Sequence, residues 1–261
     1  MSILNKIIET KKTEIEICKK NNSFSDLEKF KDFNRNTNSL SKSLINSDFG
    51  IISEFKRKSP SKSVINNNSS VDKVIKGYEN AGVCGISVLT DGPYFGGALE
   101  DLLLARASVE TPLLRKEFIV DPYQIIEAKA HGADAILLIA AVLTRAEIHD
   151  LSTLAQSLGL EVLLEVHNLE ELEKSIMPSL NMIGVNNRNL KTFEVSLGIS
   201  RALSAIIPSD FVKISESGIS DVSAIKDLKT YGYQGFLVGE NFMKTHDPGA
   251  AALAFIKQIE G

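Results

Sequence analysis

The stretch AILLIAAVLTRAEIHDLSTLAQSLGLEVLLEVHNLEELEKSIMPSLNMIGVNN, residues 135–187, alternates three short apolar runs with two amphipathic ones. The apolar runs are hydrophobic on both faces, which is typical of strands in a parallel sheet covered by helices; they span 135–140, 161–166 and 182–187. Between them, Thr144 with Glu147 and Asn168 with Glu171 resemble capping boxes at helix starts. The stretch therefore predicts strands alternating with helices, the pattern of an α/β fold.

The same alternation extends in both directions from about residue 48. Asp121-Pro122 and Asp247-Pro248 each read as an N-cap followed by proline at the first helical position. Five further strands are expected at 49–55, 85–90, 112–118, 211–217 and 235–239. The eight units predict a (β/α)8 TIM barrel over residues 48–261. A doubly wound open sheet is the alternative, but no G-x-G-x-x-G motif follows the first strand.

Residues 1–47 precede the barrel pattern and are expected to form an N-terminal helical extension of a single domain spanning 1–261. Ile3, Leu4, Ile7 and Ile8 fall at helical spacing, and Ser25 to Glu28 could start a second helix. Two interpretations remain open: the extension packs on the barrel, or it is a solvated arm with no role at the active site. Residues 62–70, KSVINNNSS, predict a mobile loop after the first strand.

The composition bounds the class of protein. The chain is 43% hydrophobic and 24% charged, with a formal net charge of −4. This acidity argues against nucleic acid as the main partner, because binding to a phosphate backbone needs a basic face. The charged N-terminus has no signal-peptide core, and no run reaches membrane-spanning length, so we expect no membrane association and a cytoplasmic location.

The cysteines and histidines give no sign of a metal site or a disulfide. Cys18 and Cys84 have no short metal-ligand spacing and are expected to be reduced thiols. The four histidines form no grouping of two with a carboxylate. His167 lies nearest the expected rim of the barrel, where it is interpreted as a loop or capping residue. We therefore expect neither a metal ion nor a histidine base.

Five of the expected strands carry charged or amide side chains near their carboxyl ends, where barrel enzymes place their reacting groups. Side chains two residues apart share a face of a strand, so these can point together into a closed barrel. They would place three carboxylates and two ammonium groups around one mouth, where their proximity shifts proton affinities. The residues are Glu54, Lys56, Lys116, Glu165, Asn186, Arg188 and Glu216.

The last two units predict a phosphate site. Gly218 and Gly239 lie where backbone N–H groups can approach an anion, and a short extra helix can begin after Gly239. Barrels commonly hold phosphate at these two units. From the residues alone, we predict an enzyme that acts on a phosphorylated small molecule.

Five motifs together resemble the indole-3-glycerol-phosphate synthase family of tryptophan biosynthesis. They run in order along the barrel as SEFKRKSPSK (53–62), LRKEF (114–118), EVH (165–167), GVNNRNL (184–190) and SESGI (215–219). The resemblance implies the substrate 1-(2-carboxyphenylamino)-1-deoxyribulose 5-phosphate. It implies ring closure with loss of carbon dioxide and water, to give indole-3-glycerol phosphate without a cofactor.

The resemblance also implies roles for individual residues. Lys116 would be the acid that protonates the ketone oxygen. Glu165 would act in the later proton transfers, with Glu54 partnering it or a lysine, and which carboxylate serves which step stays open. Lys56 would clamp the anthranilate carboxylate or the phosphate side. Asn186 and Glu216 would bind the sugar hydroxyls, Phe95 and Phe118 would flank the aromatic ring, and Ser59 would contribute to substrate binding. The phosphate would be surrounded by Arg188, Ser217, Gly218, Gly239 and Glu240. Glu240 would act through its backbone N–H, with its side chain turned away.

The sequence departs from the family pattern at three positions. Ser63 stands where glycine is common, Ala98 where serine is frequent, and Asn189 where aspartate is usual. None is a proposed acid or base. A sugar-phosphate isomerase or another phosphate-binding barrel of the pathway is the alternative enzyme, and it would not need both Lys56 and Lys116. A catalytically silent binding module is the other alternative. We expect a monomer, or a weak association with other enzymes of the pathway.

Overall fold

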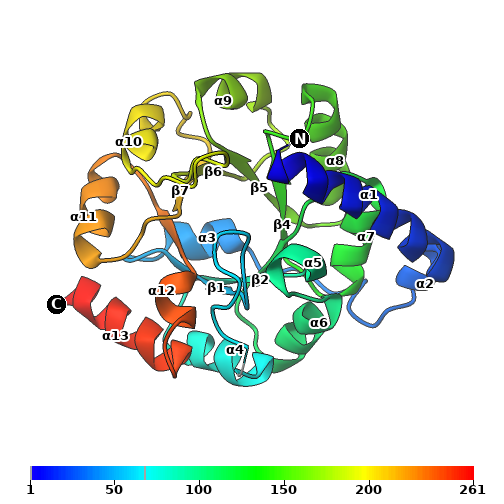
Figure 1. The fold of residues 1–261 in the computed structure, drawn as a ribbon, viewed down its shortest axis with the longest axis horizontal. Coiled ribbons are helices and arrows are strands. Elements are labelled where there is room, and N and C mark those ends of the chain that lie inside the picture. Colours follow the sequence, from blue (N-terminus) through cyan, green and yellow to red (C-terminus); the bar gives the residue numbers. More distant parts are fainter. Residues whose placement is uncertain (1, 68) are drawn as a thin grey trace.

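The computed structural model describes residues 2–67 and 69–261. Met1 and Asn68, which fall in the predicted extension and the predicted loop, lie outside the described residues. Eight parallel strands pair in chain order, and β8 pairs with β1 to close a barrel, as predicted (Figure 1). The strands are β1 (Ile51–Phe55), β2 (Gly85–Leu89), β3 (Leu113–Lys116), β4 (Ala135–Ile139), β5 (Glu161–Val166), β6 (Met182–Asn186), β7 (Val212–Glu216) and β8 (Gly235–Val238).

Helices form a ring around the barrel, as Figure 1 shows. The wall between strands and helices is apolar and continuous, from Phe55 and Val74 to Phe236 and Ile256. This two-layer burial is what strands that are hydrophobic on both faces require. The helices after β1 are α4 (Val71–Asn80), α5 (Gly92–Phe95), α6 (Leu99–Ser108), α7 (Pro122–Ala130), α8 (Arg145–Ser157), α9 (Leu169–Ser175), α10 (Gly198–Ser204), α11 (Val222–Thr230), α12 (Glu240–Met243) and α13 (Pro248–Glu260).

Most predicted helix starts are confirmed by cap hydrogen bonds. Asp121 and Asp247 cap α7 and α13, and Thr144 forms a capping box with Glu147 at α8. Asn168 caps α9, but the predicted box with Glu171 is wrong. The Glu171 carboxylate instead accepts from the backbone N–H of His167 at 2.8 Å, because there it also reaches the His167 ring.

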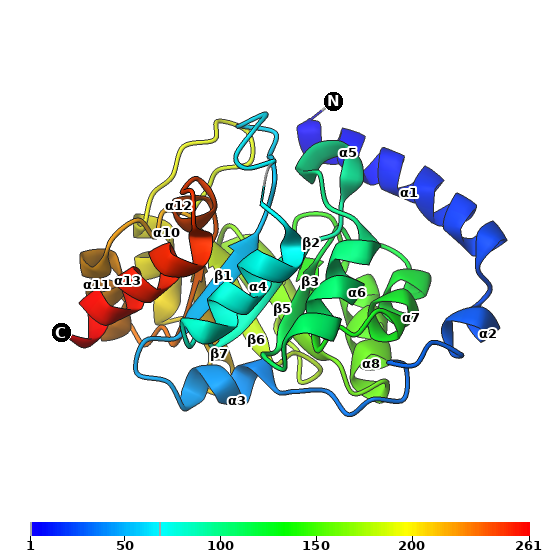
Figure 2. The same cartoon turned by 90° about the horizontal axis from the view of Figure 1, so that it is seen from below.

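The extension forms α1 (Ile3–Asn21), α2 (Phe24–Leu27) and α3 (Leu40–Ile45). The second helix begins two residues earlier than predicted, because Ser23 and Asp26 form its capping box. Figure 2 shows α3 at one end of the barrel and α1 near the other, beside α5. Leu40 and Leu44 of α3 pack into the barrel interior, so α3 closes the end where the strands begin.

One buried carboxylate fastens the extension to the strand-start end of the barrel. Asp134 is fully buried and pairs with Arg106 at 2.8 Å and with Arg35 of the extension at 2.7 Å. It also accepts hydrogen bonds from the backbone N–H groups of Asn38 and Leu113.

Among the helices of the described residues, none combines the length and the apolar character that a membrane span needs.

We predict that Asp134→Ala destabilises the protein by about 3–5 kcal/mol, because it leaves the buried Arg106 guanidinium without its carboxylate. Chemical denaturation measures the change. Asp227→Ala is the matched control, since its pair with Arg201 is solvent-exposed and is worth about 0–1 kcal/mol. Equal losses for the two variants would contradict the anchoring role of Asp134.

Ala98, one of the departures from the family pattern, occupies the N-cap of α6 in an extended conformation and makes no side-chain cap bond. A serine hydroxyl there can accept from a free N–H group of the first turn. We predict that Ala98→Ser raises the free energy of unfolding by about 1 kcal/mol. The reverse change, Asp247→Ala at the capped start of α13, should lower it by a similar amount. Thermal unfolding that ranks the two variants in the opposite order would overturn the prediction.

Candidate active site

A cavity of about 410 Å³ opens at the carboxyl ends of the strands. Every residue singled out from the sequence as a site residue lines it, so the structure brings the predicted set together; the roles of these residues stay predictions. The set comprises Glu54, Lys56, Ser59, Phe95, Lys116, Phe118, Glu165, Asn186, Arg188, Glu216, Ser217, Gly218, Gly239 and Glu240.

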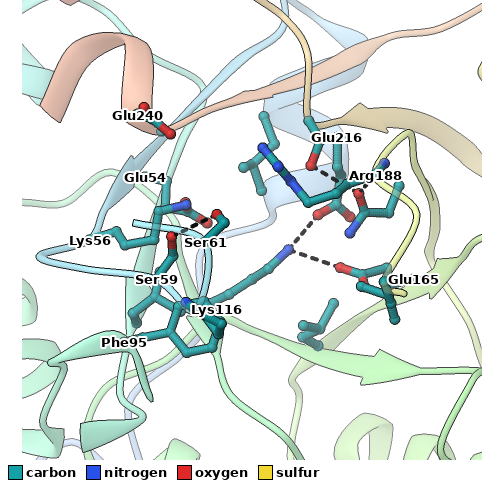
Figure 3. Close-up of a pocket in the computed structure, with 18 of the residues that line it drawn as sticks. Glu54, Lys56, Ser59, Ser61, Phe95, Lys116, Glu165, Arg188, Glu216 and Glu240 are labelled. Atoms are coloured by element: carbon teal, nitrogen blue, oxygen red, sulfur yellow. Dashed lines mark hydrogen bonds and ion pairs between the residues drawn. The ribbon is translucent and has the colours of Figure 1, made fainter. Parts of the chain in front are cut away.

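The ammonium of Lys116 lies at the centre of the cavity between two carboxylates (Figure 3). It is 3.3 Å from Glu165 Oε2 and forms a closer ion pair with Glu216. The three groups come from β3, β5 and β7, and all are largely buried. One proton donor and two potential proton acceptors are therefore held next to one another inside the cavity.

These charges shift one another's proton affinity. Burial lowers the pKa of Lys116, but the carboxylates of Glu216, Glu165 and Glu54 outweigh burial and hold its pKa above the ordinary value. Burial raises the pKa of Glu216 to about 7, with the Glu165 charge adding to the rise against the pull of Lys116. Burial also disfavours the charge on Glu165, but Lys116 and His167 lower its pKa below the usual range. The two carboxylates thus differ in proton affinity, which is a basis for separate acid and base roles.

A second ion pair lines the wall formed by β1. Glu54 Oε1 lies 2.5 Å from Lys56 Nζ. Two glycines make room for the carboxylates of the cavity. A Cβ at Gly239 would lie 2.4 Å from Glu54 Oε1, and one at Gly184 would lie 2.3 Å from Glu216 Oε1. A side chain at either position would therefore displace a carboxylate of the cavity, which explains why glycine suits both.

One side of the cavity is aromatic and aliphatic. The Phe95 and Phe118 rings tilt against each other with centroids 5.9 Å apart. Ile3, Leu4 and Ile7 of α1 also line the cavity, which rules out the interpretation of the extension as a solvated arm. The sequence signal for this contact was the apolar stripe of α1, but the stripe did not show what it faces.

The opposite side carries Arg188 and the loop after β7. Ser217 has a φ of 65° and Gly218 one of 78°, so the backbone turns sharply there. The Ser217 hydroxyl donates to Asn186 Oδ1 at 2.9 Å. Asn189, a departure from the family pattern, accepts from the backbone N–H groups of Lys191 and Thr192, so it retains the turn-forming role of an aspartate.

Asn187 supports this loop and was missed as a site residue. It is fully buried, donates to the backbone oxygens of Glu216 and Ser217, and accepts from the Ser200 hydroxyl at 2.9 Å. It thereby holds the loop in its left-handed turn. An amide at the end of an apolar strand was the available signal, but its partners lie 13 to 30 residues away in the chain.

The loop after β1 reaches across the mouth to α12. Lys62 Nζ lies 2.9 Å from Glu240 Oε1, and both side chains are partly exposed. The Glu240 side chain therefore turns to this loop. The predicted short helix after Gly239 is confirmed as α12, with Gly239 as its N-cap residue.

His167 lies behind Glu165, with Nε2 at 3.3 Å from Glu165 Oε1 and Nδ1 at 3.1 Å from Glu171. Burial lowers the pKa of the imidazole, but the two carboxylates outweigh burial and raise it to about 10. The ring is therefore a cation at neutral pH and steadies the charge on Glu165. Within residues 2–67 and 69–261, no group of three His, Cys, Asp or Glu side chains could hold a metal ion.

Comparison with known proteins gives consistent names. The sequence profile of the family described as "Indole-3-glycerol phosphate synthase" matches residues 4–255. A Bacteroides thetaiotaomicron protein of that name is 45% identical over 258 residues, covering 99% of both chains. One from Aliarcobacter butzleri is 43% identical over 246 residues, covering 93% of this chain and 94% of the relative.

Solved structures share the fold at low sequence identity. Chains of the tryptophan synthase complex from Pyrococcus furiosus match with a TM-score of 0.61 and 15% identity, over 82% of this chain and 98% of that one. A structure described as native KDPGal matches with a TM-score of 0.60 and 14% identity, over 82% and 96%. At this identity the likeness shows the barrel alone.

The raised pKa of Glu216 predicts a pH effect on stability. Between its ordinary value of 4.5 and about 7, folded Glu216 holds a proton that the unfolded chain has lost. Its contribution to stability therefore falls as pH rises through that window. Glu216→Gln resembles the protonated form at every pH, so its melting temperature relative to the parent protein should rise between pH 5 and pH 8. Glu173→Gln, at an exposed carboxylate on α9, should show no such trend. A constant difference for Glu216→Gln would refute the shift.

Proposed function

The chain belongs to the indole-3-glycerol phosphate synthase family, and on that premise we propose how its cavity closes an indole ring. The substrate is 1-(2-carboxyphenylamino)-1-deoxyribulose 5-phosphate, and the products are indole-3-glycerol phosphate, carbon dioxide and water. The observation that carries the proposal is the position of Lys116, whose ammonium lies between Glu165 and Glu216 in a cavity with an aromatic wall on one side and Arg188 on the other.

Ring closure begins when the aryl carbon that bears the carboxylate attacks the ketone carbon of the sugar. The ketone oxygen gains negative charge as the new carbon–carbon bond forms, so a proton donor beside it lowers the barrier. We assign this donor to Lys116. Its neighbouring carboxylates keep it protonated at neutral pH, as an acid must be before the step. Loss of carbon dioxide then restores the aromatic ring.

The second half of the reaction removes the new hydroxyl as water, which needs an acid, and takes a proton from the five-membered ring, which needs a base. Glu165 is the assigned carboxylate for part of this work, because its lowered pKa keeps it ionised. Glu54 partners either Glu165 or a lysine, and it lies 2.5 Å from Lys56. Lys56 would clamp the anthranilate carboxylate or the phosphate side of the substrate.

The remaining contacts orient the substrate. Phe95 and Phe118 would flank the aryl ring, with Ser59 at the edge of the same cavity. Asn186 and Glu216 would bind the sugar hydroxyls. Glu216 Oε1 supports this role, since it is buried and receives no hydrogen bond from the described residues. Holding the chain bent for attack supplies much of the rate in such a cyclisation.

The phosphate would lie beside Arg188, where Gly218, Gly239 and Glu240 line the cavity, with Glu240 contributing its backbone N–H. Ser217 would add its backbone and hydroxyl. We further propose that the enzyme is a cofactor-independent carbon–carbon lyase that works in the cytoplasm. It would act as a monomer, or in weak association with other enzymes of tryptophan biosynthesis.

The direct test adds the carboxyphenylamino-deoxyribulose phosphate to purified protein and follows the fluorescence of the indole product. We expect fluorescence to rise with time in proportion to enzyme concentration. Folded protein that gives no signal would overturn the proposed function.

Lys116→Met should lower kcat by about 10²–10⁴-fold, the usual contribution of a general acid, while inorganic phosphate still inhibits at the parent concentration. Lys213→Met is the matched control: this lysine is also on a barrel strand, β7, but its amine donates to the backbone of Ser204 among the helices. The control should keep near-parent turnover. Near-parent turnover by Lys116→Met would show that another group protonates the ketone.

A further inference from the structure

Lys11, on α1 of the extension, is the centre of a buried ion cluster that the proposed chemistry does not use. Its side chain is 7% exposed. Its Nζ lies 3.1 Å from Asp91 Oδ2 and 3.1 Å from Glu117 Oε1, both buried, and 2.7 Å from Glu14 on its own helix. Burial lowers the pKa of Lys11, but Glu117, Glu14 and Asp91 outweigh burial and raise it above the ordinary value, so the side chain is charged.

Asp91 connects this ammonium to the helix that carries Phe95. Its Oδ1 caps α5 by accepting from the backbone N–H groups of Tyr94 at 2.8 Å and Phe95 at 3.1 Å. Its Oδ2 is buried and receives no hydrogen bond within the described part of the chain, so the Lys11 charge is what offsets it. Lys11 therefore adjoins the carboxylate whose other oxygen caps the helix of Phe95.

Glu117 connects the same ammonium to the segment that carries Phe118. Its Oε1 accepts from the backbone N–H of Phe118 at 2.8 Å, and its Oε2 accepts from the Thr90 hydroxyl at 2.8 Å. Arg115 lies farther away, at 3.9 Å from Oε2. Glu117 lies between Lys116 and Phe118 in the chain, so displacement of its carboxylate would disturb both.

We propose that Lys11 is a positioning residue that fixes the spacing of the aromatic wall by joining the loop after β2 to the loop after β3. The proposal rests on the proposed function, in which Phe95 and Phe118 flank the aryl ring of the substrate. Figure 2 shows α1 beside α5, and a second contact joins them, between the Thr10 hydroxyl and the Tyr94 hydroxyl at 3.1 Å. The extension thus sets the geometry of one half of the cavity.

The physical reason is the charge count. Asp91 and Glu117 are two buried carboxylates that meet at the Lys11 ammonium. Without the ammonium, the two negative charges would repel each other and would be buried without solvation. Loss of Lys11 would therefore separate the two loops and with them Phe95 and Phe118. The phosphate side of the cavity is built on residues that follow β6, β7 and β8, and no hydrogen bond or ion pair of residues 2–67 and 69–261 joins it to this cluster.

The test compares Lys11→Met with Lys19→Met. Lys19 lies on the same helix and pairs with Asp121 at 2.7 Å, so its loss also removes an ion pair between α1 and the barrel, but not one at the cavity. For Lys11→Met we expect KM for the carboxyphenylamino-deoxyribulose phosphate to rise about tenfold or more, since misplaced binding groups cost up to about a hundredfold. The inhibition constant of inorganic phosphate should stay within about twofold. Lys19→Met should change neither.

A double-mutant cycle with Asp91→Asn tests the route. Asparagine keeps the cap oxygen but lacks the charge that repels Glu117. If Lys11 acts through Asp91, the double variant should have a KM no higher than Lys11→Met alone, so the effects are not additive. Should Lys11→Met not fold, Asp91→Asn alone should raise KM and leave phosphate inhibition unchanged.

Each outcome separates the two proposals. A parent protein that makes no indole product defeats the proposed function. A parent protein that turns over, with Lys11→Met at parent KM, defeats the positioning role alone. Parallel losses of substrate and phosphate affinity in Lys11→Met would also defeat it, because they would mark a general loss of structure.

Discussion

Closure of eight parallel strands is the constraint on which the rest of the structure depends. All strands run the same way around one axis, so alternate side chains of each strand meet at that axis and all carboxyl ends meet at one mouth. One face of β5 shows the consequence. Glu161 accepts hydrogen bonds from Ser39 and Ser41 at the strand-start end, Leu163 packs in the interior, and Glu165 enters the cavity. Residues two apart on one face of β5 thus anchor the extension, fill the barrel interior and line the cavity.

The mouth formed in this way has to hold charge out of water. Buried ions are tolerated when they are paired, and here Lys116 is shared by Glu165 and Glu216 while His167 faces Glu165 from behind. Burial and the neighbouring Glu165 charge raise the pKa of Glu216, whereas Lys116 and His167 outweigh burial at Glu165 and hold its pKa below the ordinary value. The same arrangement therefore stabilises the buried charges and gives the site groups that differ in proton affinity.

The sequence predicts the strands and the cavity residues well because the signals for both are local. Apolar runs mark each strand to within two residues, and a polar side chain at the end of such a run marks the rim. Contacts between residues far apart in the chain leave no comparable signal. Nothing in the run of α1 shows that Lys11 pairs with Glu117, and nothing around Asn187 shows that its amide meets Ser200. At Glu171 the signal was local but ambiguous, because its carboxylate can reach either the backbone of Asn168 or the backbone and ring of His167, four residues away.

The N-terminal extension gains its importance from this same geometry. A barrel has two open ends, and residues of the extension serve both: Leu40 and Leu44 of α3 fill the interior at the strand-start end, while Ile3, Leu4 and Ile7 of α1 line the cavity. The chain between them is fastened by Arg35 to the buried Asp134. The helix at the mouth and the helix that plugs the other end belong to one segment of the chain, so this segment contributes to both ends of the barrel. The extension is thus part of the barrel's closure as well as of its active site.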